Sequence, residues 1–82
     1  MESPIREHRK QLGVAASELA AALGVSISTL GFWERGHVVP PEDRQRELAG
    51  LLGVPEDDLR SELVTFRDGF ARRAREKLAR VS

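Results

Sequence analysis

Residues 16–33 decide the fold, and they read ASELAAALGVSISTLGFW. Ala20 lies where two helices would touch, because only a small side chain lets two helix backbones come close. Gly24 follows four residues later and permits a tight turn. Leu30 and Trp33 then supply the inward face of the next helix. The spacing predicts two short helices that meet at a steep angle across a glycine turn, although two unrelated amphipathic helices are an alternative.

The rest of the chain also favours helices, because apolar residues recur at helical spacing and no run alternates apolar and polar residues with period two. Four of the glycines fall where such a helix would end, and glycine is the residue that best tolerates the positive φ found there. The sequence therefore predicts an all-α fold. We expect helices over residues 4–12, 15–23, 27–35, 41–52 and 55–63, followed by an additional C-terminal helix.

The charges of the 82 residues balance, with thirteen Lys and Arg against thirteen Asp and Glu. A net charge of zero excludes a strongly basic protein that coats nucleic acid by charge alone. The balance hides an asymmetry. Seven acidic and three basic residues give residues 42–62 a charge of −4, whereas six basic and two acidic residues give residues 65–82 a charge of +4.

Several classes of protein and site have no support in the sequence. The sequence contains no cysteine. This excludes a disulfide scaffold, a thiolate metal site and a cysteine nucleophile. No apolar run approaches the roughly 18 residues of a membrane helix, and the first residues lack the order of a signal peptide, so we expect a cytoplasmic protein that does not bind a membrane. His8 and His37 lack metal-binding spacing, and no catalytic constellation is present. We therefore expect no enzyme activity, no metal and no cofactor.

Further motifs flank the central stretch, namely IREHRKQLG at 5–13, WERG at 33–36 and RELAGLLGV at 46–54, with Asp58-Leu59 after them. Together with the central stretch they resemble the Cro/phage-repressor (Xre-like) helix-turn-helix family over about residues 4–63. The resemblance implies a five-helix repressor-like helix-turn-helix bundle whose third helix, about residues 27–35, enters the major groove of DNA. It also implies an ion pair between Arg9 and Glu34, which would fix the third helix against the first.

By resemblance, the protein is a sequence-specific DNA-binding transcription regulator, with double-stranded DNA as its partner and a homodimer as its form. Ala16 departs from the family, which usually has a polar phosphate-binding residue at the start of the second helix. The outward positions of the third helix also carry no Arg, Asn or Gln to read bases. The candidate base contacts are Ile27, Ser28, Thr29 and Phe32, and the candidate phosphate contacts are Arg6, Lys10, Arg35 and Arg44.

An apolar set near the third helix supports a different function. Ile27, Phe32, Val38 and Val39 could form one exposed apolar face, and such faces usually mark contacts between proteins. The alternative hypothesis is therefore a repurposed helix-turn-helix module that binds a protein partner through this face.

The end of the chain forms a second segment, so we expect a helix-turn-helix domain over residues 1–64 and a basic amphipathic helix or tail over residues 65–82. Its apolar residues are spaced as a helical stripe that something must cover, although Gly69 disfavours one continuous helix. The sequence leaves open whether this segment dimerises, binds DNA or folds back on the domain. The candidate contacts with a second copy or another partner are Phe66, Phe70 and Leu78.

Overall fold

The computed structural model describes residues 3–81, so the outer ends of the two expected segments, residues 1, 2 and 82, lie outside it. The described residues form five helices and no strand, which confirms the all-α helix-turn-helix bundle. The helices are α1 (Pro4–Leu12), α2 (Ala16–Leu23), α3 (Ile27–Glu34), α4 (Glu42–Leu52) and α5 (Glu56–Val81).

Short-range hydrogen bonds determine where the first three helices begin. The Ser26 hydroxyl accepts a hydrogen bond from the backbone N–H of Thr29 at 3.0 Å and so caps α3, and Ser3 caps α1 in the same way. Ala15 has no side-chain acceptor for α2, but its own backbone N–H donates to Glu18 Oε1 at 3.0 Å. Because every cap lies within three residues of its partner, these helix starts were predictable from the sequence to within one residue.

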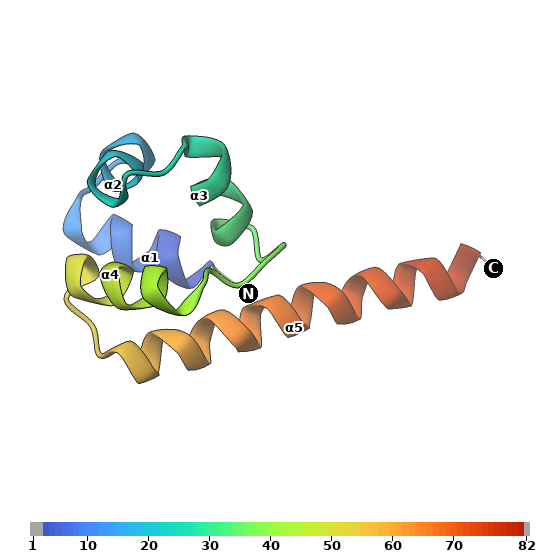
Figure 1. Cartoon of the computed structure of the whole chain (residues 1–82). Helices are drawn as coiled ribbons and strands as arrows, with labels where there is room; N and C mark the ends of the chain where they lie inside the picture. Colours follow the sequence, from blue (N-terminus) through green and yellow to red (C-terminus); the bar gives the residue numbers. More distant parts are fainter. Residues whose placement is uncertain (1–2, 82) are drawn as a thin grey trace.

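The core lies between the pair α2 and α3 on one side and α1, α4 and the first half of α5 on the other (Figure 1). The chain bends by 110° between α2 and α3, which is the steep angle of a helix-turn-helix. Ala20 and Trp33 are buried in this pair, and Ile5, Leu48 and Leu59 are fully buried below it. The small residue and the aromatic residue of the deciding stretch therefore both lie inside the core.

The fifth helix and the expected C-terminal helix are one continuous element. α5 has 26 residues, which corresponds to a length of about 39 Å, and Figure 1 shows its second half extending away from the other helices. The glycine at position 69 does not break it, because one glycine costs a helix only about 1 kcal/mol and the residues around it include Ala, Arg, Lys and Leu, which are strong helix formers. As far as Val81, α5 does not fold back on the domain. We call residues 71–81 of α5 the arm.

Replacing Gly69 with alanine is expected to stabilise α5 by about 0.5–1 kcal/mol, because an added Cβ would meet only the Arg73 Nη1 atom, at 3.4 Å. The ellipticity at 222 nm and the thermal midpoint should both rise. Gly50→Ala is the matched control for helix propensity alone, since an added Cβ at that position in α4 meets nothing within 4 Å. A loss of ellipticity in Gly69→Ala would contradict a continuous α5.

Two further findings concern the described residues only. No single helix among them is long and apolar enough to span a membrane, and α2 and α3 reach that length and composition only as a bent pair. No group of three or more His, Asp or Glu side chains among them lies close enough to hold a metal ion.

Candidate nucleic-acid interface

An ion pair fixes α3 to the rest of the domain. Arg9 Nε donates to Glu34 Oε2 and Arg9 Nη2 donates to Glu34 Oε1, both at 3.1 Å, while Arg9 Nη1 donates to the carbonyl oxygen of Val14 at 3.1 Å. The side chains of Arg9 and Glu34 are only 14% and 13% exposed. One guanidinium thus joins α1, the turn before α2 and the end of α3, and the bidentate geometry also fixes the direction of α3.

The outer surface of α3 carries most of the candidate base contacts. Ile27 and Ser28 are exposed, and the side chain of Phe32 is 47% exposed. Thr29 differs, because it is half-buried and its Oγ1 accepts a hydrogen bond from the Ser26 hydroxyl at 3.0 Å. Beside this surface lies an open hollow of about 400 Å³, lined by parts of α3 and by Ala16 at the start of α2. A ligand on α3 would therefore meet two apolar side chains, one free hydroxyl and a shallow hollow.

Arg35 brings a positive charge onto the same surface. Its guanidinium lies back across Gly31, so that Nη1 is 3.0 Å from the position that a Gly31 Cβ would occupy. Its Cζ atom also lies 5.4 Å from the centroid of the Phe32 ring, a cation–π distance. The sequence alone predicts Arg35 only as a phosphate contact. The signal that could have located it is the arginine four residues after a helical glycine, since such residues face each other.

The other candidate phosphate contacts differ in their availability. Arg6 and Lys10 are exposed on α1. Arg44, on α4, already donates to the carbonyl oxygen of Leu23 at 2.7 Å and to Glu47 Oε1 at 3.1 Å. Nη1 therefore satisfies a carbonyl at the end of α2, and the other guanidinium nitrogens of Arg44 are the ones left for a phosphate.

The expected apolar face of four residues does not form. Val39 packs against the core, because the chain turns inward there towards the buried Pro40. Ile27, Phe32 and Val38 remain exposed. Phe32 is also in contact with the side chains of Arg35 and His37. Only three of the four side chains are therefore available to a partner.

Phe66 is not available to a partner either, because its side chain is only 7% exposed and lies in this chain's own core. Its ring packs against Gly36, just after α3, where an added Cβ would lie 2.8 Å from the ring. The other two candidates are more accessible, since Phe70 is partly exposed and Leu78 is 69% exposed.

Three aromatic rings in tilted contact connect α3 with α5. The ring centroid of His37 lies 5.7 Å from that of Phe32 and 4.8 Å from that of Phe70, tilted by 42° and 39°. We call Phe32, His37 and Phe70 the aromatic bridge. The bridge makes the outer surface of α3 continuous with one face of α5.

Known proteins are similar to the first four helices of this chain and the start of the fifth. A family model described as Helix-turn-helix matches residues 5–59, which form α1 to α4 and the start of α5. An uncharacterized HTH-type transcriptional regulator of Methanothermobacter thermautotrophicus is 40% identical over 53 residues, or 65% of this chain and 77% of that protein. The uncharacterized HTH-type transcriptional regulator YazB of Bacillus subtilis is 38% identical over 55 residues, or 67% of this chain and 80% of that protein. No solved structure shows a significant match.

Proposed function

Because the chain belongs to the Cro/phage-repressor (Xre-like) helix-turn-helix family, we propose that it is a transcription regulator that binds double-stranded DNA in a sequence-specific way. The observation that carries the proposal is the family match over residues 5–59, which includes the whole of α3 and the ion pair that fixes it. A net charge of zero means that binding depends on fit and on local charges rather than on the overall field.

In the proposed complex, α3 lies in the major groove, which is wide enough to admit a helix. The Ser28 hydroxyl bonds to a base edge or a phosphate, and Ile27 and Phe32 contact thymine methyl groups. Arg35 contributes a guanidinium from its position over Gly31, where it can reach guanine or a phosphate. Arg6 and Lys10 remain candidate phosphate contacts from α1.

A charge placed on α3 tests the proposal. Ser28→Glu puts a carboxylate in the first turn of α3, where the helix dipole tolerates it, so the fold should persist. The matched control is Ser61→Glu, which adds the same charge to an exposed serine of α5 within the domain. Fluorescence anisotropy would be measured at low salt with labelled duplexes that the wild-type chain has enriched from a random pool.

We expect Ser28→Glu to weaken binding at least about tenfold, because a carboxylate among phosphates and acceptor-rich base edges is repelled and one polar contact is lost. Ser61→Glu should bind nearly as the wild type does. No enrichment of any sequence and no binding at micromolar protein would overturn the proposal, and so would equal effects of the two substitutions.

The proposal includes a homodimer. Two copies on a palindromic site would place their α3 helices in major grooves about 34 Å apart. Sedimentation of the complex is expected to give two chains per duplex. A protein partner on the apolar face is less favoured, because Val39 is packed on the core and the rings of the aromatic bridge lie against Phe32.

A further inference from the structure

One face of α5 changes its chemistry where the domain ends. Leu59, Leu63 and Phe66 are buried, and Phe70 contacts His37 in the aromatic bridge. These residues are spaced four, three and four apart, so they share one face of the helix. The same spacing continues into the arm with three basic residues, Arg73, Lys77 and Arg80. We call these three the basic face.

The basic face continues the outer surface of α3. The aromatic bridge leads from Phe32 on α3 to Phe70 on α5, and directly beyond Phe70 an open hollow of about 200 Å³ is lined by Arg73, Ala74 and Lys77. Figure 1 shows the arm projecting past the loop that follows α3. A long ligand that lies on α3 and extends over the aromatic bridge would therefore meet the basic face next.

The three side chains of the basic face line one hollow together with Glu76, so three positive charges stand against one negative charge there. Arg73, Lys77 and Arg80 are exposed and form no ion pair within the described part of the chain. By contrast, two arginines of residues 42–62 do form ion pairs. Arg46 and Arg60 pair with Glu56 at 3.7 Å and 3.1 Å. The basic face thus presents unpaired positive charge over a length of about 10 Å.

We propose that the basic face contacts the phosphate backbone of the same duplex that α3 reads, so that α5 is a second DNA-binding element of this chain. The inference rests on the proposed function, because it needs a duplex on α3. The family match ends at residue 59, so the arm lies outside the matched region. A second copy fits this face poorly, because pairing it with itself would oppose like charges at the positions that a helix pair fills with apolar residues.

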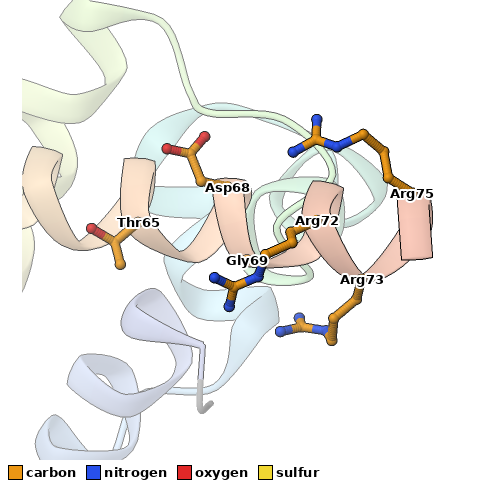
Figure 2. Close-up of a pocket in the computed structure, with 6 residues that line it drawn as sticks. All are labelled: Thr65, Asp68, Gly69, Arg72, Arg73 and Arg75. Carbon is orange, nitrogen blue, oxygen red and sulfur yellow. The ribbon is translucent and has the colours of Figure 1, made fainter. Parts of the chain in front are cut away.

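Two triple variants with equal charge separate the basic face from a general effect of charge. The test variant is Arg73→Gln/Lys77→Gln/Arg80→Gln, and the control is Arg67→Gln/Arg72→Gln/Arg75→Gln. Figure 2 shows that Arg73 and Arg75 leave α5 in opposite directions, although both line one pocket with Arg72. The spacing of the two sets along the helix places their members on different sides of it. Both variants change the net charge from zero to −3, and glutamine keeps a high helix propensity. Among the ion pairs of the described residues, the control loses the exposed pair of Arg67 with Asp68 and no other.

Anisotropy with one labelled 30-base-pair random duplex, at salt between 50 and 200 mM, would give the slope of log K against log salt for each protein. Each phosphate contact contributes about 0.9 to the slope, so the test variant should lose about 2–3 units of slope. Over this salt range the wild type should then weaken about 40-fold more than the test variant. The control should keep nearly the wild-type slope, and circular dichroism should show equal helix content in all three.

Equal slopes for the two triple variants would overturn the inference and leave the proposed function standing. A test variant that changes the sedimentation mass but not the slope would also overturn it, because a second copy would then cover the basic face. If the wild-type chain binds no duplex at 50 mM salt, the proposed function and the inference both fail.

Discussion

Replacing Arg9 with alanine is expected to lower the free energy of unfolding by about 3–5 kcal/mol. The substitution leaves the Glu34 carboxylate, which is only 13% exposed, without its bidentate donor. It also removes the hydrogen bond that Arg9 Nη1 donates to the carbonyl oxygen of Val14. A domain of this length has a total stability of roughly 4–12 kcal/mol. A large fraction of Arg9→Ala should therefore be unfolded at mild denaturant concentrations.

Urea titration followed by the fluorescence of Trp33 measures this loss, since the indole is buried and adjacent in sequence to Glu34. Arg67→Ala is the control, because it removes an exposed pair at 3.3 Å and should cost less than about 1 kcal/mol. The double variant Arg9→Met/Glu34→Leu should recover most of the stability, because no charge is left buried. If Arg9→Ala costs no more than the control, the pair does not fix α3.

Replacing Gly36 with alanine is expected to cost about 2–5 kcal/mol, for two separate reasons. Gly36 has φ of 80°, which costs a residue with a Cβ about 1–2 kcal/mol. The new Cβ would also lie 2.8 and 2.9 Å from two ring atoms of Phe66, and displacing this buried ring costs about 1–3 kcal/mol more.

Gly53→Ala separates these two causes, because Gly53 has φ of 71° but nothing within 4 Å of an added Cβ. It should show the backbone cost alone. In the background of Phe66→Leu, Gly36→Ala should cost less than in the wild type, since the smaller side chain leaves room for the Cβ. Equal midpoints of thermal unfolding for Gly36→Ala and Gly53→Ala would contradict a close contact between Gly36 and Phe66.

The fold was largely predictable because its signals are local. Ser26 and Gly24 mark a helix start and a helix end by their own backbone chemistry, and Ala20 marks a close contact by its size. The continuity of α5 is harder to predict, because Gly69 disfavours a helix at that position but costs it only about 1 kcal/mol.

The candidate site was harder to predict, because long-range contacts decide which side chains are available. Arg44 is held by a carbonyl 21 residues away. Val39 is partly buried and Phe66 is buried, in both cases by elements that the sequence does not show to be neighbours. The sequence does not distinguish a charged or apolar side chain that is packed against a partner from one that is exposed to solvent. The partners of such residues can be identified only once the helices are packed.

The continuity of α5 also has a mechanical consequence. The helix is one rod whose first half is held in the core, while about 16 Å of it projects beyond Phe70. A tilt of about 10° around Phe70 would therefore carry the far end sideways by about 3 Å. Two ring contacts, Phe66 on Gly36 and Phe70 on His37, therefore determine the direction in which the arm projects from the domain.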